Sequence, residues 1–151
     1  MRRAWYGLNQ AFRRRIAHLG ITPDQFTALR TLIEHRELSQ TQLTRLMASD
    51  PNTIASLLER MESSGLIDRK MLESDRRTRA VSVRAAGRRK YEEARDIALQ
   101  LQAEVLHPIP RSQRERFLSQ LASVADACRN AVPPPPRAVK KEPRSRTFQG
   151  S

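Results

Sequence analysis

Apolar residues recur every three or four positions along most of the chain, which is the spacing of one face of an α-helix. The first such stretch covers about residues 2–19 and ends at Gly20, a residue suited to the left-handed turn that closes many helices. Its apolar stripe consists of Trp5, Leu8, Phe12, Ile16 and Leu19. The pattern predicts an amphipathic helix at the start of the chain.

Three further helices begin at recognisable capping sequences. Thr22 with Gln25, and Ser39 with Gln42, have the spacing of a capping box, in which the two residues satisfy each other's backbone N–H groups. Asp50 precedes Pro51, which combines an N-cap acid with a proline at the first helical position. The pattern therefore predicts helices from Thr22, from Ser39 to about Met47, and from Asp50 to about residue 64.

The hydrophobic period changes at Gly65. Residues 66–71 and 80–83 are short strand-like stretches, and the second alternates between apolar and polar side chains. The eight residues between them, 72–79, are polar and highly charged. We expect a β-hairpin with a basic tip.

Helical spacing returns after Gly87 and continues until Pro108 and Pro110 interrupt it. Ser112 with Glu115 then suggests a third capping box at the start of a last helix, whose apolar stripe is Phe117, Leu121, Val124, Cys128 and Val132. The fold class is therefore mainly α, with one hairpin. Two short helices, a turn and a hairpin follow the order of a winged helix-turn-helix.

The charge of the chain points to an anionic partner. Its 151 residues carry a net charge of +12. Residues 133–151 contribute five basic residues and one acid but no periodic apolar pattern, so they are predicted to form a disordered, Pro-rich basic tail. The remaining +8 lies on residues 1–132, which are predicted to form one domain, and a surplus of that size favours nucleic acid or an anionic membrane surface.

Several functional classes are disfavoured by the sequence. It contains no uninterrupted apolar segment of the roughly 18–20 residues that a membrane-spanning helix needs, and we expect a soluble, cytoplasmic protein. Gly-rich phosphate loops, paired metal ligands and Ser-His-acid sets are all missing, so neither an enzyme nor a cofactor or metal site is expected. The single cysteine, Cys128, lies on an apolar stripe, where we expect a buried and inert thiol.

The predicted helix at 50–64 has the two faces that a DNA-recognition helix needs. Its inward side is apolar, whereas its outward side carries short polar groups and one arginine, namely Asn52, Thr53, Ser56 and Arg60. Such side chains can approach base edges, and the N–H groups at the start of the helix can contact a phosphate. Taken alone, an ordinary solvated face explains this pattern better.

The segment that follows favours the DNA interpretation. Residues 69–90 include nine basic residues and two acids, which is +7 of the +8 on the predicted domain. A charged run is usually a solvated surface, but here it includes a hairpin tip, where Arg76, Arg77 and Arg79 can reach a narrow minor groove. Asp75 lies two residues from Arg77 and can hold its guanidinium in position by a charge-assisted bond.

Together these residues resemble the multiple-antibiotic-resistance regulator (MarR) family of winged helix DNA-binding proteins. The resemblance is carried by Leu38-Ser39, Asp50-Pro51, Leu58 with Glu62 and Gly65-Leu66-Ile67, and Asp75-Arg76-Arg77. It extends more loosely from Trp5 to near Val132. Two departures stand out: Ser56 is found where many relatives have a larger basic residue, and Arg84-Ala85-Ala86-Gly87 replaces the more usual Leu-Thr-x-x-Gly.

The resemblance implies a homodimeric regulator, usually a repressor, that binds a pseudo-palindromic operator in double-stranded DNA. Asn52, Thr53 and Ser56 match the family's recognition-helix contacts, and Asp75 with Arg77 matches its wing pair. The reading head is then about residues 22–86, and the dimerisation helices are about residues 2–19 and 88–132. The expected interface residues are Trp5, Leu8, Phe12, Leu101, Phe117, Leu121 and Val124.

Two alternatives stay open from the sequence. Trp5, Phe12 and His18 could line a pocket for a small aromatic anion, the kind of effector that the family often binds, although such a stripe is more often simply dimer core. A basic protein that binds RNA or coats DNA without operator specificity would suit the +12 charge as well. Such a protein would not need a capped recognition helix followed directly by a wing.

Overall fold

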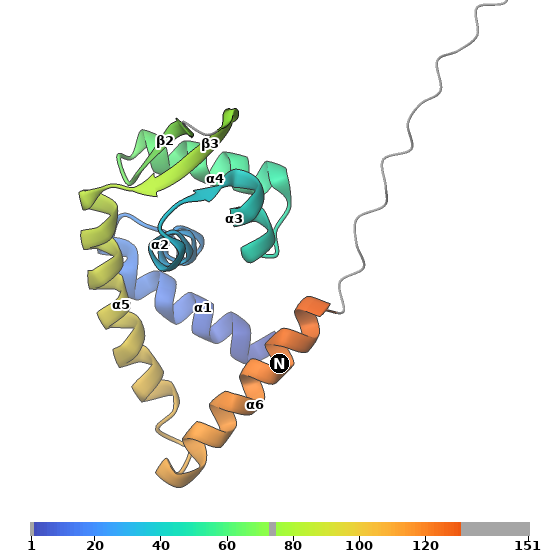
Figure 1. Cartoon of the computed structure of the whole chain (residues 1–151). Helices are drawn as coiled ribbons and strands as arrows, with labels where there is room; N and C mark the ends of the chain where they lie inside the picture. Colours follow the sequence, from blue (N-terminus) through green and yellow to red (C-terminus); the bar gives the residue numbers. More distant parts are fainter. Residues whose placement is uncertain (1, 73–74, 131–151) are drawn as a thin grey trace, which may run out of the picture. The chain divides into compact units, whose positions relative to one another are not determined.

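The computed structural model describes residues 2–72 and 75–130, with the side chains of residues 71–79 and of the last two helical residues outside that description (Figure 1). The chain divides into two compact units, Met1–Arg114 and Glu115–Ser151, which are considered separately. The boundary falls inside the region predicted as one domain. The elements are α1 (Arg2–Ile16), the 3-10 turn η1 (Ala17–Leu19), α2 (Pro23–His35), β1 (Leu38–Ser39), α3 (Gln40–Leu46), α4 (Pro51–Ser63), β2 (Ile67–Leu72), β3 (Asp75–Val83), α5 (Ala85–Val105) and α6 (Arg111–Asn130).

Local capping determines where the early helices start and stop. Both predicted capping boxes, at Thr22 and at Ser39, are present with reciprocal side-chain and backbone bonds. Asp50 caps α4 as predicted, and Gly20 ends η1 in the left-handed conformation with φ of 66°. The mainly α winged helix-turn-helix predicted from the sequence is confirmed.

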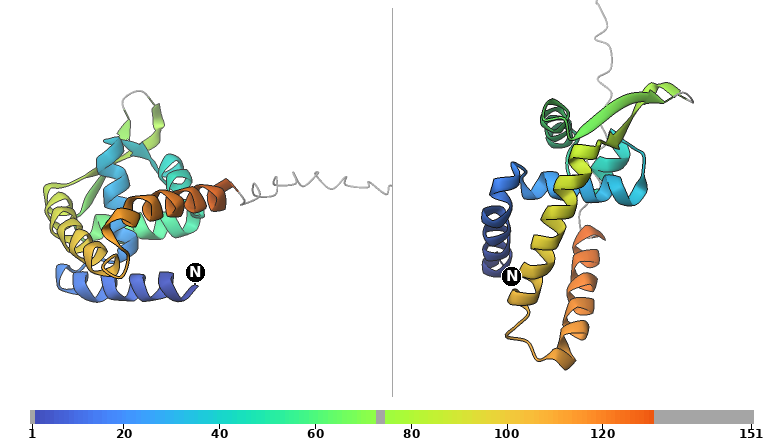
Figure 2. Two further views of the ribbon diagram at one scale, coloured as in Figure 1. Left: turned by 90° about the horizontal axis from the view of Figure 1, so that it is seen from below. Right: turned by 90° about the vertical axis from the view of Figure 1, so that its left-hand side faces the viewer.

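The core of the first unit forms where the end of α1, the helices α2 to α4 and the base of the sheet meet. Its fully buried side chains come from each of these elements: Ile16, Leu29, Leu32, Leu43, Ile54, Leu58, Met61, Leu66, Ile67 and Val81. The views in Figure 2 show α5 running beside α1 and α2. The helix-turn-helix of α3 and α4 is therefore held on a rigid base.

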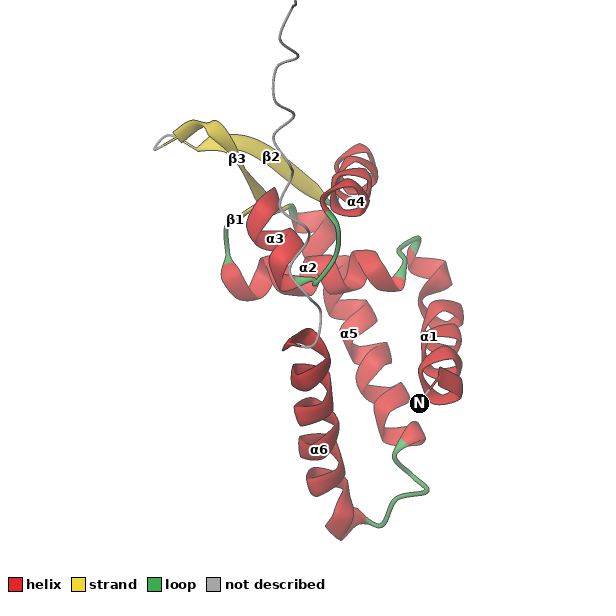
Figure 3. Cartoon of the chain, turned by 90° about the vertical axis from the view of Figure 1, so that its right-hand side faces the viewer, coloured by secondary structure: helices red, strands yellow, loops and turns green. Residues whose placement is uncertain are grey.

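The sheet has three antiparallel strands in the order β1-β3-β2. The two-residue strand β1 was not predicted; it pairs Leu38 with Val81. β3 was predicted to begin at Ala80 but begins at Asp75, so most of the segment assigned to the connection is strand. The reason is that β2 and β3 extend past the helices as a narrow hairpin (Figure 3), and a strand without a buried face needs no apolar alternation.

The last two helices also differ from the sequence prediction. α5 begins at Ala85, two residues before Gly87, which was expected to precede it. α6 begins at Arg111, so the predicted capping box at Ser112 is wrong: Ser112 is already helical, and the Gln113 N–H donates to the carbonyl of Pro110. Cys128 was expected to be buried, but it is exposed. The predicted tail, residues 133–151, lies outside the described residues.

Candidate DNA interface

The two faces of α4 are separated as the sequence predicted. Its inner face is buried, with exposed fractions of 3% or less for Ile54, Leu57, Leu58 and Met61. Its outer face presents all four predicted contact residues, Asn52, Thr53, Ser56 and Arg60, as exposed side chains. Three of them are four residues apart and form one row along the helix. This row can lie against base edges while the inner face stays packed.

The start of α4 differs from the expectation that its N–H groups would bind a phosphate. Asp50 Oδ1 accepts hydrogen bonds from the N–H groups of Asn52 (3.1 Å) and Thr53 (2.9 Å), and the Thr53 hydroxyl donates to Oδ2. Chiefly because of that hydroxyl, and also because of the Thr53 N–H, the pKa of Asp50 is lowered. The helix N-terminus is thus neutralised from within the chain.

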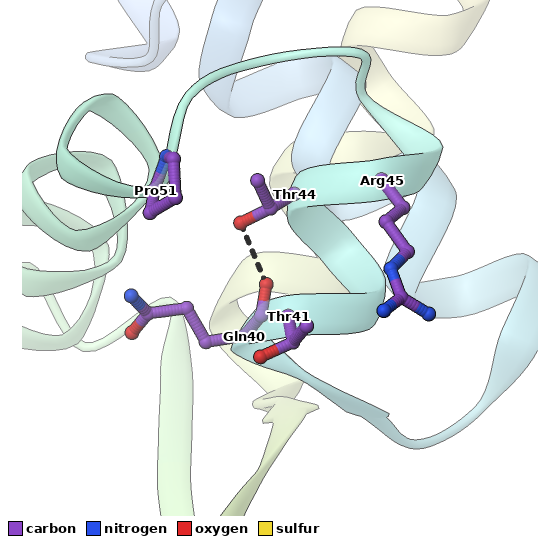
Figure 4. A pocket seen from close by; sticks show the side chains of 5 residues that line it. All are labelled: Gln40, Thr41, Thr44, Arg45 and Pro51. Carbon is purple, nitrogen blue, oxygen red and sulfur yellow. Dashed lines mark hydrogen bonds between the residues drawn. The ribbon is translucent and has the colours of Figure 1, made fainter. Parts of the chain in front are cut away.

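A hollow of about 220 Å³, lined mainly by residues of polar type, lies between α3 and the start of α4 (Figure 4). It is lined by Gln40, Thr41, Thr44, Arg45 and Pro51. The Thr44 hydroxyl donates to the Gln40 carbonyl (2.8 Å), while Thr41 and Arg45 are exposed. Sequence reasoning missed these residues because a polar face on a short helix looks like any solvated surface. Hydroxyl, amide and guanidinium donors together suit the oxygen atoms of a nucleic-acid backbone.

The hairpin carries the predicted wing residues on β3. The backbone of Asp75, Arg76, Arg77 and Arg79 belongs to this strand, and the pairing with β2 shifts between Met71 and Leu72, as in a β-bulge. Bulges increase the local twist of a hairpin. The side chains lie outside the described residues, so the bond between Asp75 and Arg77 stays a prediction.

Two ion pairs lie at the base of the hairpin. Glu62, the acid of the first pair, was named from the sequence only as part of the family motif, and Asp68, the acid of the second, was not singled out. Arg69 on β2 donates from Nε to Glu62 Oε2 at the end of α4 (2.8 Å). Arg84 Nε donates to Asp68 Oδ1 (2.8 Å), and Arg84 Nη2 lies 2.8 Å from the same oxygen in an ion pair. The hydrogen bond from Arg84 lowers the pKa of Asp68 and the bond to Asp68 raises that of Arg84. Two of the nine basic residues between 69 and 90 are therefore neutralised locally.

The residues predicted to form a dimer interface fall into two groups. Trp5 and Leu8 on α1 are 66% and 47% exposed, and Phe117, Leu121 and Val124 on α6 are also exposed. In contrast, Leu101 is buried within the chain, and Phe12 packs edge-on against Phe26 with ring centroids 5.0 Å apart. Leu101 and Phe12 are therefore less accessible than the other five predicted interface residues.

The predicted effector residues are not brought together by a described hollow. Trp5 and Phe12 lie two turns apart on α1, and His18 is exposed in η1. A hollow of about 380 Å³ on α1 is lined by Arg2, Arg3 and Tyr6 instead.

Among residues 2–72 and 75–130, no group of three His, Cys, Asp or Glu side chains could hold a metal ion, and no helix is long and apolar enough to cross a membrane.

Comparison with known proteins agrees with this geometry. The sequence profile of the MarR family matches residues 21–78, from the start of α2 into the wing. The chain is 32% identical to a probable transcriptional regulator from Pseudomonas aeruginosa, with a TM-score of 0.68 over 80% of this chain and 93% of that one. This chain belongs to the MarR family. Its MarR relatives are transcriptional regulators rather than enzymes.

Two other MarR-type proteins illustrate the range of the similarity. The organic hydroperoxide resistance transcriptional regulator of Bacillus subtilis is 38% identical over 79 residues, which cover 52% of this chain and about half, 54%, of the relative. The transcriptional repressor CouR, solved on a 23-mer DNA duplex, is 26% identical with a TM-score of 0.77 over 82% of this chain and 88% of that one.

Proposed function

We propose that this chain is a homodimeric repressor that binds a pseudo-palindromic operator in double-stranded DNA and is released by a small aromatic anion. The observation that carries the proposal is the row Asn52, Ser56 and Arg60 on α4, exposed beside a basic hairpin. α4 enters a major groove in this account. Because the proposed repressor binds operator sites in genomic DNA, we expect it to act in the cytoplasm.

In this proposal α4, the hollow beside α3 and the wing each contact a different part of the duplex. Asn52 and Ser56 are short enough to bond base edges, and Arg60 reaches a guanine edge or a phosphate. The hollow that includes Thr41 and Arg45 contacts the backbone. On the wing, Arg77, held by Asp75, enters the minor groove, and Arg76 and Arg79 contact phosphates on either side. Relatedness to CouR, which was solved on duplex DNA, supports this assignment.

Exposed apolar side chains support the homodimer. Trp5, Tyr6 and Leu8 on α1 are each about half or more exposed, as are Leu99 and Val105 on α5. α6 adds Phe117, Leu121 and Val124 on one side of the helix. Patches of this kind mark interfaces in soluble proteins. A two-fold dimer then presents two α4 helices to half-sites about one helical turn apart.

The effector assignment rests on the aromatic rings between α1, α2 and α5. Phe26 packs edge-on against Phe12 and stacks on Tyr91 at 5.4 Å, and Trp5 and His18 belong to the same first helical segment. A flat anion can stack beside Phe12 while His18 or a neighbouring arginine meets its charge. Trp5 is the only tryptophan, so titration with salicylate should change its fluorescence in a saturable way. A change that only grows linearly with salicylate would contradict the effector site.

The alternative is a basic protein that binds RNA or coats DNA without operator specificity, and affinity measured against salt separates the two. We expect the chain to prefer duplex DNA to a structured RNA hairpin of equal charge, and to keep that preference as salt rises, because base and groove contacts are less screened than phosphate contacts. Equal affinities that fall together with salt would contradict the proposal.

A further inference from the structure

The helix α5 starts without a side-chain cap, and the residue at that position has another partner. Arg84 occupies the N-cap position in an extended conformation, but its side chain makes no capping hydrogen bond. Its guanidinium instead holds one oxygen of Asp68 in β2, as described above. The position that usually stabilises a helix start is here used to attach α5 to the wing.

Backbone contacts also join the start of α5 to the junction between α4 and β2. The Arg84 N–H donates to the carbonyl oxygen of Leu66 (3.0 Å), and a Cβ atom on Gly87 would lie only 2.2 Å from that oxygen. Leu66 is the residue between α4 and β2 and is almost fully buried. The first turn of α5 therefore packs closely against the junction between α4 and β2.

Asp68 and Arg69 are neighbours on β2, and their side chains lie on opposite faces of the strand. Arg69 attaches the strand to Glu62 on α4, while Asp68 attaches it to Arg84 at the start of α5. β2 is therefore fixed from both sides. The two ion pairs add to the backbone pairing of β2 with β3 and to the burial of Ile67 at the start of the strand.

We infer that Asp68 and Arg84 are positioning residues that set the angle between the wing and α4, so that both reach the same duplex. The inference rests on the proposed DNA-binding function. Both side chains are partly exposed, at 34% and 52%, and exposed pairs are weak. We therefore expect loss of the pair to weaken duplex binding by about twofold to fivefold per protomer.

A competing role for Arg84 predicts a different pattern. If Arg84 simply contacted a phosphate, Asp68 would compete with the DNA, and Asp68→Asn would tighten binding. Arg84→Gln would then also remove close to one unit from the slope of log affinity against log salt. A positioning role predicts that either substitution weakens binding, that the double variant is no weaker than Arg84→Gln alone, and that the salt slope is unchanged.

The test uses the full chain and a duplex of about 30 base pairs enriched by the wild-type chain from a random library, long enough for two half-sites one turn apart. Fluorescence anisotropy at several salt concentrations compares wild type, Asp68→Asn, Arg84→Gln and the double variant. Arg88→Gln is the matched control, because Arg88 is an exposed arginine one turn further along α5 and its effect should simply add to that of Asp68→Asn. Asp68→Glu keeps the carboxylate and should restore wild-type affinity.

Tighter binding by Asp68→Asn, or effects of the two substitutions that multiply, would overturn the positioning role. Enrichment of no duplex by the wild-type chain would instead contradict the proposed function. Hydrogen exchange without DNA then still decides the inference: Asp68→Asn and Arg84→Gln should each speed exchange of the backbone N–H at position 84 by about twofold to fivefold, after correction for the intrinsic exchange rate of each sequence. An unchanged exchange rate at position 84 would show that the Asp68–Arg84 pair does not hold the start of α5 in place.

Discussion

Arg15 on α1 and Glu104 on α5 are joined by two parallel hydrogen bonds, although 89 residues separate them in the sequence. Arg15 Nη1 lies 2.9 Å from Glu104 Oε1, and Nη2 lies 2.5 Å from Oε2. The bond from Arg15 is the main reason that the pKa of Glu104 is lowered. The pair joins α1 to the end of α5. Both helices were predicted to form the dimer interface, and they are connected here within one chain.

Removing that carboxylate should lower the melting temperature slightly at low salt. Glu104→Gln loses the charge-assisted bonds, but both side chains are more than a third exposed, so the effect should shrink near 1 M salt, where the Debye length is about 3 Å. Thermal unfolding followed by circular dichroism measures it. Glu93→Gln, another exposed acid on α5, is the control; an equal loss in that variant would mean that the pairing with Arg15 does not matter.

Gly87 should not tolerate even one added carbon atom. Gly87→Ala places a Cβ atom 2.2 Å from the Leu66 carbonyl oxygen and 3.1 Å from Leu29 Cδ2, so α5 must move away from the α4–β2 junction. We expect the free energy of unfolding to fall by about 1–3 kcal/mol, as in other overpacked cores. Denaturant titration measures the loss.

Gly7→Ala is the matched control for that experiment. Gly7 is also inside a helix, but among the described residues nothing beyond its own helical backbone and chain neighbours lies within 4 Å of an added Cβ, so helix propensity alone should stabilise the variant by about 0.5–1 kcal/mol. Similar effects of the two substitutions would show that the close approach at Leu66 is relieved without cost.

The cap of α4 should make stability depend on pH. The pKa of Asp50 is lowered in the folded chain, so its contribution to stability is complete above the carboxyl pKa of the unfolded chain and is lost as pH falls through the lower folded value. Asp50→Asn keeps a capping oxygen but does not titrate. We expect wild type to lose stability relative to Asp50→Asn below about pH 4, as measured by denaturant midpoints. A constant difference between them at every pH would contradict this origin.

Arg36 lies in a conformation that only glycine adopts freely. Its φ of 63° and ψ of −60°, with the Glu37 N–H bonded to the His35 carbonyl (2.8 Å), form a tight γ-turn between α2 and β1. Arg36→Gly should raise the free energy of unfolding by about 1 kcal/mol, because strain of this kind costs about 1–3 kcal/mol and glycine relieves it. Arg36→Ala removes the same side chain but keeps the Cβ atom; an equal gain there would assign the effect to the arginine side chain instead.

The features predicted correctly from the sequence are those set by neighbouring residues. Thr22 bonds with Gln25, and Asp50 accepts bonds from Asn52 and Thr53, all within one helical turn, so the local sequence was sufficient to predict these caps. The outer row of α4 followed from helical period alone. Such local patterns gave the helices, the hairpin and the position of Asn52, Ser56 and Arg60.

The features that were missed depend on contacts between distant segments. β1 exists only because Leu38 meets Val81 across the sheet. Gly87 was taken as a break before a helix, whereas it lies inside α5, where an added Cβ atom would clash with the Leu66 carbonyl oxygen. The pair of Asp68 and Arg84 joins residues 16 apart, and no periodicity links them.

Sequence selection by the intact chain tests the central claim most directly. A random duplex library should be enriched for an inverted repeat whose half-sites are centred about 10 base pairs apart, and sedimentation of the complex should give two chains per duplex. That spacing follows from two α4 helices in successive major grooves. Enrichment of no common sequence, or one chain bound per site, would contradict a homodimeric repressor that reads an operator.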